Sequence, residues 1–223
     1  MVLFLPARDE APRLAAVIDR APAVVHGRPV VVLVVDDGST DGTADVARAA
    51  GARVVDGGGR GLGNAVRVGL AEAVLLGAAV VAFCDADGEY DPAELPLLAG
   101  SILDGHADYV VGSRFAGRIG HMRPHRRFGN RVLTRWVRWT TRLPVTDGQS
   151  GFRALSPAAA QGAELVHDYN YAQVLTLDLV GKGYRYAEVP ISYAFRQSGE
   201  SFVKLGRYLR NVVPAVWREL NDR

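Results

Sequence analysis

Residues 83–89 read FCDADGE and end an apolar run that begins at Ala78. A short apolar run that switches abruptly to acidic residues is typical of a buried strand that ends in a polar loop. Asp85, Asp87 and Glu89 stand at alternate positions in that loop. Clustered carboxylates at the end of a buried strand are costly unless a positive charge lies among them. The stretch therefore predicts either a divalent metal site, of the kind in which Mg²⁺ takes one or two carboxylates, or a solvated turn.

Apolar runs alternate with helical segments around this stretch. The expected strands are residues 2–5, 30–35, 52–55 and 78–83. Helices are expected from about residue 9 and over 43–50 and 64–76. This alternation favours a parallel α/β sheet, in which ligands bind at the carboxyl ends of the strands. The polar loops that follow three strand ends, residues 6–10, 36–41 and 85–91, should therefore meet and form a nucleotide pocket.

A glycine-rich segment, GGGRGLG, occupies residues 57–63. It lacks the G-x-G-x-x-G spacing of a dinucleotide-binding loop, and the acidic residue that would hold a ribose about twenty positions later is missing. We expect a flexible loop whose backbone and Arg60 approach a phosphate group.

Composition limits the class of protein. The chain has 223 residues, of which 48% are hydrophobic, and one cysteine, Cys84. A disulfide within the chain is impossible, which fits a reducing, cytoplasmic setting. The first residues do not resemble a signal peptide, and no apolar run reaches the length of about 18 residues that spans a bilayer. We therefore expect a soluble or peripheral protein. The net charge is only +2, yet residues 114–142 contain nine arginines and no acidic residue.

Two acidic motifs resemble those of a known family. They are DDGSTDGT at 36–43 and DAD at 85–87. They are similar to motifs of the family 2 glycosyltransferases, which have a GT-A fold that binds nucleotide sugars. Four later motifs resemble, within that family, the polyprenyl-phosphate (dolichol-phosphate) mannosyltransferases. These are GSR at 112–114, TDGQSGFR at 146–153, GYR at 183–185 and EVPI at 188–191.

The resemblance implies a fold for nearly the whole chain. Residues 1–201 are expected to form a GT-A α/β domain, with a mainly parallel central sheet flanked by helices. Residues 202–223 are expected to form a C-terminal amphipathic helix that packs on the domain or lies on a membrane surface.

The resemblance also implies a donor site and a metal site. The implied donor contacts are Pro6, Arg8, Glu10, Asp36, Asp37, Arg60, Gly63 and Asp85. The implied ligands of Mg²⁺ or Mn²⁺ are Asp85, Asp87 and Glu89. Glu89 stands where the mannosyl enzymes usually carry glutamine, and Asp9 stands where asparagine is usual. The GLGNA sequence at 61–65 is like the GLGxA of the mannosyl enzymes, which favours GDP-mannose as the donor.

A lipid monophosphate acceptor needs no strong general base, because it is already an anionic nucleophile at neutral pH. The enzyme must instead position two anions and stabilise the departing diphosphate, and one in-line displacement would invert the sugar. The residues implied in catalysis are Asp87, Arg114, Arg126, Asn130 and Asp147. The alternative for Asp147 is a simple turn residue. Asp168 lies just upstream of the position where hydroxyl-transferring relatives carry a catalytic carboxylate.

A basic amphipathic helix is predicted over residues 125–142. One stripe consists of Arg127, Arg131, Arg135, Arg138 and Arg142, and a second consists of Phe128, Val132, Trp136 and Trp139. Basic helices with tryptophan are typical of membrane interfaces. The alternative is a core-packed helix with a solvated arginine face, which we favour for the C-terminal segment considered alone.

The sequence thus predicts a metal-dependent, inverting glycosyltransferase that moves a sugar, mannose by preference, to a polyprenyl phosphate at the cytoplasmic face of a membrane. One alternative keeps the fold but uses UDP-glucose or a soluble acceptor. Another is a non-catalytic nucleotide-sugar-binding partner of a membrane protein. Nucleic acid is not an expected partner, because no recognised binding motif accompanies the positive charge. The sequence specifies no oligomeric state.

Overall fold

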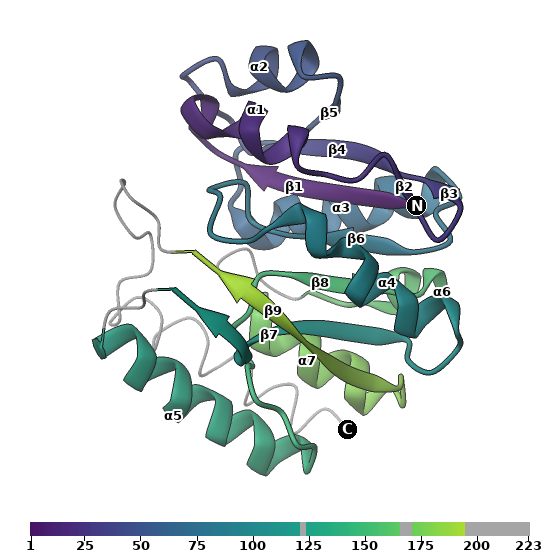
Figure 1. Cartoon of the computed structure of the whole chain (residues 1–223), viewed down its shortest axis with the longest axis vertical. Helices are drawn as coiled ribbons and strands as arrows, with labels where there is room; N and C mark the ends of the chain where they lie inside the picture. The colour runs from purple at the N-terminus through teal and green to yellow at the C-terminus, as the bar shows by residue number, and fades with distance from the viewer. Residues whose placement is uncertain (121–123, 166–170, 195–223) are drawn as a thin grey trace.

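The computed structural model describes residues 1–120, 124–165 and 171–194. Its centre is a seven-stranded sheet of order β5-β4-β1-β6-β8-β7-β9 (Figure 1). The strands are β1 (Val2–Ala7), β4 (Val31–Asp36), β5 (Arg53–Asp56), β6 (Val81–Phe83), β7 (Tyr109–Ile119), β8 (Arg153–Leu155) and β9 (Tyr186–Tyr193). The pairings of β8 with β6 and β7 are antiparallel, and the other pairings in this sheet are parallel. The predicted mainly parallel sheet is confirmed.

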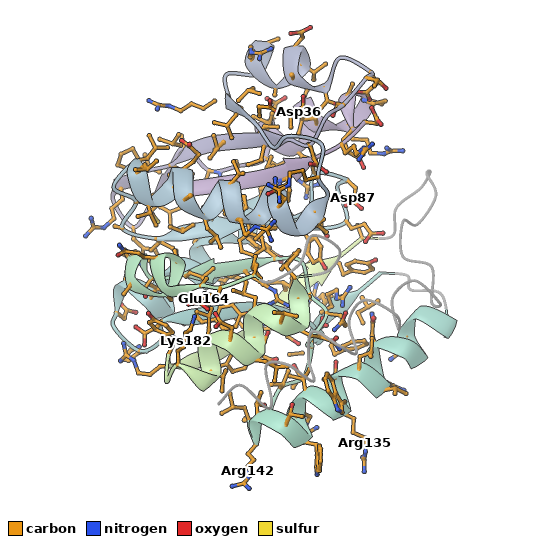
Figure 2. The ribbon with its side chains drawn as sticks, turned by 180° about the vertical axis from the view of Figure 1, so that it is seen from behind. Asp36, Asp87, Arg135, Arg142, Glu164 and Lys182 are labelled. Carbon is orange, nitrogen blue, oxygen red and sulfur yellow. The ribbon has the colours of Figure 1, made fainter. Side chains whose placement is uncertain are left out.

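Helices cover both faces of the sheet, as the two opposite views show (Figures 1 and 2). They are α1 (Ala11–Asp19), α2 (Thr43–Ala49), α3 (Leu62–Leu75), α4 (Leu95–Leu103), α5 (Pro124–Thr141), α6 (Pro157–Gly162) and α7 (Ala172–Gly181). The 3₁₀ turn η1 (Pro92–Glu94) precedes α4, and β2 (Val24–Val25) and β3 (Arg28–Pro29) form a small hairpin.

The core is divided by the alternating side chains of β1. Leu3 and Leu5 belong to the apolar cluster that includes residues of α1 and α4. Phe4 belongs to the cluster that includes residues of α3, α6 and α7, and its ring stacks on Phe83 with centroids 4.8 Å apart. A Cβ added at Gly69 of α3 would lie 2.4 Å from the Phe4 ring. Glycine therefore allows α3 to approach the sheet closely.

Strand β1 continues through Pro6 to Ala7, so the predicted end of this strand at residue 5 was wrong. The Cys84 N–H donates to the Phe4 carbonyl, so the even-numbered residues of β1 direct their backbone polar groups toward β6. Strand β6 ends at Phe83, which pairs with Phe4. Pro6 therefore lacks its N–H on the side of β6, and β1 continues because its pairing with β4 on the other side extends through Pro6 and Ala7.

Strand β6 is shorter than predicted, because it begins at Val81 rather than Ala78. The Ala78 N–H donates to the Ala73 carbonyl at the end of α3. The first residues of the apolar run thus close the preceding helix, and only the last three join the sheet.

Helix α5 packs against α7 through a face that differs from the predicted apolar stripe. Thr134 and Val137 are buried, whereas 51% of Val132 and 78% of Trp139 are exposed. The side chain of Phe128 and the predicted helix at 202–223 lie outside the described residues. Within the described ranges, no helix is both long enough and apolar enough to cross a membrane.

Candidate active site

Hydrogen bonds tie together the loops that follow β1 and β4. The Asp9 N–H donates to Ser39 Oγ at 3.0 Å, and Asp9 Oδ1 accepts the Thr40 N–H at 2.8 Å. Asp41 Oδ2 accepts the Ala11 N–H at 3.0 Å. The sequence identified Asp9 only as a departure from the family pattern. In the structure its carboxylate fixes one predicted donor loop against the other.

Asp37 connects these loops to the glycine-rich segment. Its buried carboxylate accepts the Gly61 N–H at 2.9 and 3.1 Å, and the Arg8 guanidinium lies 4.0 Å away. Asp36 is half-buried, and its Oδ1 accepts the Ser39 N–H at 3.0 Å. The predicted donor residues Asp36 and Asp37 therefore differ: Asp37 anchors a loop, whereas Asp36 lies closer to solvent.

Four further predicted donor residues, Pro6, Glu10, Arg60 and Gly63, belong to the same loops or to the elements beside them. Pro6 is in the last part of β1, and the following Glu10 is buried, with its N–H donating to Thr43 Oγ1 at 2.9 Å. Gly63 is buried in the first turn of α3, and Arg60 precedes that helix with an exposed side chain. The structure thus brings together the loops after β1 and β4, two of the three loops that were predicted to meet, and joins them to the glycine-rich segment after β5.

The acidic loop after β6 is built around Asp85. A Cβ at Gly151 would lie 2.5 Å from Asp85 Oδ2, so glycine is required where the segment around β8 passes this carboxylate. Burial and the charge of Glu89 raise the pKa of Asp85 to about 6, against the opposing effect of Arg114 and Arg153. Carboxylates that repel one another in this way favour a bound cation.

The two other predicted metal ligands of this loop, Asp87 and Glu89, already take part in hydrogen bonds. Asp87 is half-buried, and its Oδ1 accepts the Glu89 N–H at 3.0 Å. Buried Glu89 accepts the Tyr193 hydroxyl of β9 at 2.8 Å through Oε2. Among the described residues, no group of three His, Cys, Asp or Glu side chains is arranged to hold a metal ion. A cation here would therefore combine fewer carboxylates with phosphate oxygens, which is the usual pattern for Mg²⁺. Figure 2 labels Asp36 and Asp87.

Arg114 and Asp147 form a buried, bidentate ion pair. Arg114 Nε and Nη2 donate to the two Asp147 carboxylate oxygens at 2.6 and 2.8 Å, and the Arg114 N–H donates at 3.1 Å. Only 5% of Arg114 is exposed, and Asp147 is fully buried. The guanidinium carbon lies 5.2 Å from the centroid of the Tyr193 ring. Asp147 is therefore not a simple turn residue, because it fixes the orientation of Arg114.

Arg153 is a buried cation for which no role was predicted from the sequence. It donates to the Ser150 and Ala172 carbonyls at 2.9 and 2.8 Å and to the Tyr109 hydroxyl. Its guanidinium also lies 5.4 Å from the centroid of the Tyr171 ring. The TDGQSGFR motif contains this arginine, and that was the only signal in the sequence. The side chain joins β8 to the start of α7 and carries a fixed positive charge near Asp85.

The predicted catalytic residues of α5 are only partly described. Asn130 is half-buried on this helix, whereas the side chain of Arg126 and the whole of Asp168 lie outside the described residues.

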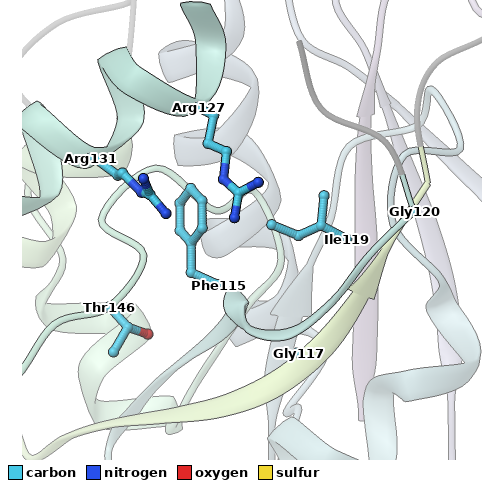
Figure 3. A pocket seen from close by; sticks show the side chains of 7 residues that line it. All are labelled: Phe115, Gly117, Ile119, Gly120, Arg127, Arg131 and Thr146. Carbon is cyan, nitrogen blue, oxygen red and sulfur yellow. The ribbon is translucent and has the colours of Figure 1, made fainter. Parts of the chain in front are cut away.

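A pocket of about 550 Å³ lies between α5 and the end of β7 (Figure 3). Arg127 and Arg131 reach it from α5, and Phe115 and Ile119 face it from β7. Its other lining residues are Gly117, Gly120 and Thr146. No pocket was predicted here from the sequence. Cationic and apolar side chains therefore line the same pocket. Two of its lining residues, Phe115 and Thr146, are the sequence neighbours of Arg114 and Asp147.

Comparison with known proteins identifies the family. Residues 3–165 match the model of glycosyl transferase family 2. A dolichyl-phosphate hexose transferase of Haloferax volcanii is 32% identical over 195 residues, or 86% of this chain and 82% of that protein. A polyprenol monophosphomannose synthase of Mycolicibacterium smegmatis is 28% identical over 214 residues, or 90% and 79%. Glycosyltransferase AglJ of H. volcanii is 33% identical over 170 residues, or 75% of this chain, and the chain spans 55% of the length of AglJ.

A solved structure shares the fold. Glucosyl-3-phosphoglycerate synthase from Mycobacterium tuberculosis, in complex with Mn²⁺, UDP and glucosyl-3-phosphoglycerate, is 25% identical with a TM-score of 0.79. The alignment covers 98% of this chain and 79% of that one. The predicted GT-A α/β fold and the predicted resemblance to polyprenyl-phosphate mannosyltransferases are confirmed. The chain belongs to glycosyl transferase family 2 and is a glycosyltransferase.

Proposed function

We propose that this glycosyltransferase moves a hexose from a nucleotide sugar to a polyprenyl phosphate. The observation that carries the proposal is the pocket beside α5. Phe115 and Ile119 offer apolar contacts there, and Arg127 and Arg131 offer positive charge. A phosphate attached to a hydrocarbon chain matches this combination, because guanidinium groups bind phosphate oxygens. The names of the dolichyl-phosphate and polyprenol relatives support the same acceptor class.

The proposed reaction is a single displacement. An oxygen of the acceptor phosphate forms a bond to the anomeric carbon while the bond from that carbon to the nucleoside diphosphate breaks. The configuration inverts, and no proton has to be removed from the nucleophile. Arg114, held by Asp147, adds a fixed positive charge beside the acidic loop, where two anionic groups must come together.

A divalent cation, Mg²⁺ or Mn²⁺, is part of the proposal. Asp85 and Asp87 would hold it, with Glu89 as a further oxygen ligand. The ion would neutralise the leaving diphosphate. The mutual repulsion of Asp85 and Glu89 supports this assignment, as does the Mn²⁺ bound in the related synthase.

We expect the donor to be GDP-mannose, so GDP should bind more tightly than UDP in the presence of Mn²⁺. The Asp36 carboxylate can accept two N–H groups from the edge of guanine but only one from uracil. One additional hydrogen bond to a charged group contributes about 1.5–3 kcal/mol, or roughly tenfold or more in affinity. Calorimetric titration with both nucleotides measures the difference.

The control for this titration is Asp36→Asn. The amide has a single acceptor oxygen, so the preference for GDP should shrink. Tighter binding of UDP by the wild-type chain would show that the donor is a uridine nucleotide, as in the related synthase.

A second candidate acceptor is a soluble phosphorylated acid. The structure of the related synthase contains glucosyl-3-phosphoglycerate, in which the sugar is joined to a small phosphorylated acid. A panel of nucleotide sugars incubated with polyprenyl phosphate, and separately with 3-phosphoglycerate, distinguishes the candidates. Lipid-linked sugar supports the proposal, and product formed only from the soluble acid supports the second candidate. Metal-dependent nucleotide binding without any transfer would indicate a non-catalytic partner.

We further propose that α5 brings the enzyme to the anionic, cytoplasmic face of a membrane. Its five stripe arginines, Arg127, Arg131, Arg135, Arg138 and Arg142, are all exposed. Figure 2 shows Arg135 and Arg142 pointing away from the body of the molecule. Trp139 is 78% exposed on the same helix and could enter the interface.

The variant Arg131→Gln/Arg135→Gln/Arg138→Gln should bind anionic vesicles much more weakly than the wild type. Each arginine contributes on the order of 1 kcal/mol near an acidic surface, so three should account for about a hundredfold. Co-sedimentation at low salt measures the binding. The matched control, Arg28→Gln/Arg48→Gln/Arg53→Gln, removes the same charge from exposed positions in other elements. Equal losses in the two triple variants would exclude α5 as the specific contact.

A further inference from the structure

Glu188 of β9 lies against the loop that carries Asp147. Its carboxylate accepts the Thr146 N–H at 2.9 Å on both oxygens and the Asp147 N–H at 3.2 Å on Oε1. Oε1 also accepts the Tyr186 hydroxyl at 2.5 Å, and Oε2 accepts the Thr146 hydroxyl. One side chain therefore satisfies two consecutive backbone N–H groups and two hydroxyl groups.

The direction of each hydrogen bond in this network can be assigned. An ionised carboxylate can only accept, so the single Thr146 hydroxyl proton points to Glu188. Ser113 Oγ lies 2.6 Å from Thr146 Oγ1 and must then donate to it. Ser113 Oγ in turn accepts the Ala116 N–H at 3.1 Å. The ordered chain runs from the β7 backbone through two hydroxyl groups to Glu188.

The network ends at the proposed reaction centre. Glu188 holds the backbone of Asp147, whose carboxylate binds the Arg114 guanidinium at 2.6 and 2.8 Å. Ser113, at the other end of the hydroxyl chain, precedes Arg114 on β7. Glu188 thus holds Asp147 directly through its backbone N–H, and it holds Ser113, the neighbour of Arg114, through the Thr146 hydroxyl.

We propose that Glu188 is a positioning residue for sugar transfer, which fixes the Arg114 guanidinium through Thr146 and Asp147 without touching the substrate. The expected loss of kcat rests on the proposed function. The expected change in the position of Arg114 rests on the hydrogen bonds alone. A carboxylate is required because both oxygens must accept. The Glu188→Gln variant keeps the size of the side chain but directs an amide N–H₂ group toward donors.

The first test observes Arg114 directly and needs no substrate. In ¹⁵N NMR spectra the Arg114 Nε–H signal, assigned by its loss in Arg114→Lys, should exchange slowly with solvent in the wild type. Glu188→Gln should shift this signal and speed its exchange at least tenfold. The matched control is Glu94→Gln, because the Glu94 carboxylate also accepts a β9 backbone N–H, that of Ser192, at 2.9 and 3.1 Å. The control should leave the Arg114 signal unchanged.

The second test is kinetic. Glu188→Gln should lower kcat for transfer to a polyprenyl phosphate by about ten- to a hundredfold, the effect expected of a reacting group displaced by about 1 Å. The KM for the nucleotide sugar should stay within about twofold, because the donor loops lie on other strands. If Glu188→Gln does not fold, Tyr186→Phe removes one donor to Glu188 and should give a smaller change of kcat in the same direction.

The outcomes separate this inference from the proposed function. A wild-type enzyme that forms no lipid-linked sugar argues against the proposed acceptor, and the NMR result then decides the role of Glu188 by itself. An unchanged Arg114 signal in Glu188→Gln overturns the inference, even if the melting temperature falls. If the wild type is active and Glu188→Gln has the same kcat, the inference is overturned as well, since Glu188 would then contribute only to stability.

Discussion

Replacing Asp87 with alanine should abolish sugar transfer and leave the fold intact. The half-buried Asp87 lies in the loop after β6, where its carboxylate accepts the Glu89 N–H. Losing that hydrogen bond costs about 1 kcal/mol of stability, whereas losing a charge that organises the leaving diphosphate should slow the reaction on the order of a thousandfold. Transfer rates at saturating Mn²⁺, measured beside thermal unfolding, test both expectations.

Asp91→Ala is the matched control for this experiment. Asp91 is an acidic residue of the same loop, but its carboxylate pairs with Arg20 at 2.5 Å and accepts the Ala93 N–H at 3.0 Å. The control should transfer sugar at close to the wild-type rate. Near-normal activity of Asp87→Ala in the presence of EDTA would show that the metal assignment is wrong.

The strands β1, β4, β5 and β6 could be predicted because the relevant signals are local, whereas β7, β8 and β9 were not predicted. Each of the four predicted strands is an apolar run that ends in a polar loop, and their parallel pairing brings these ends to one edge of the sheet. The end of β1 could not be predicted in this way. Whether Pro6 interrupts the strand depends on which neighbouring strand its missing N–H would face, and the sequence around Pro6 does not reveal that β4 pairs with the other side of β1.

The site was predicted at the level of loops but not of individual contacts. The loops after β1 and β4 were predicted to meet, and hydrogen bonds join them, but the separate contacts of Asp37 and Asp147 were not predicted. Asp37 binds the N–H of Gly61 and Asp147 binds Arg114, each far away in the sequence. Arg153 was missed because its partners are mainly backbone carbonyls and hydroxyl groups, which carry no charge pattern.

Helix α5 shows a different limit of sequence reasoning. Its 3.6-residue period gave the arginine stripe correctly, and all of those arginines are exposed. The period could not show which apolar residues meet α7. The packed face includes Thr134 and Val137, whereas Val132 and Trp139 remain exposed. Exposed apolar groups beside a row of arginines are consistent with the proposed membrane contact.

The largest loss of stability should come from replacing Asp147 with alanine. Arg114 is 95% removed from solvent and would be left without its carboxylate. Breaking a buried ion pair on one side costs about 3–5 kcal/mol, because the remaining charge is desolvated and uncompensated. In a domain of this size the melting temperature should fall by roughly 10 °C. Urea unfolding of the wild type and Asp147→Ala measures the difference, and transfer activity should be lost in parallel.

The reason for this loss can be tested with a double-mutant cycle. Arg114→Met/Asp147→Ala removes both charges, and methionine fills part of the space that the arginine side chain occupied. If the cost of Asp147→Ala comes from an unpaired buried guanidinium, the double variant should be more stable than Asp147→Ala, although it contains one substitution more. It should nevertheless be inactive, because Arg114 is absent. A double variant that loses the sum of the two single effects would show that the two side chains act independently. The buried pair would then not be what fixes Arg114 beside the acidic loop.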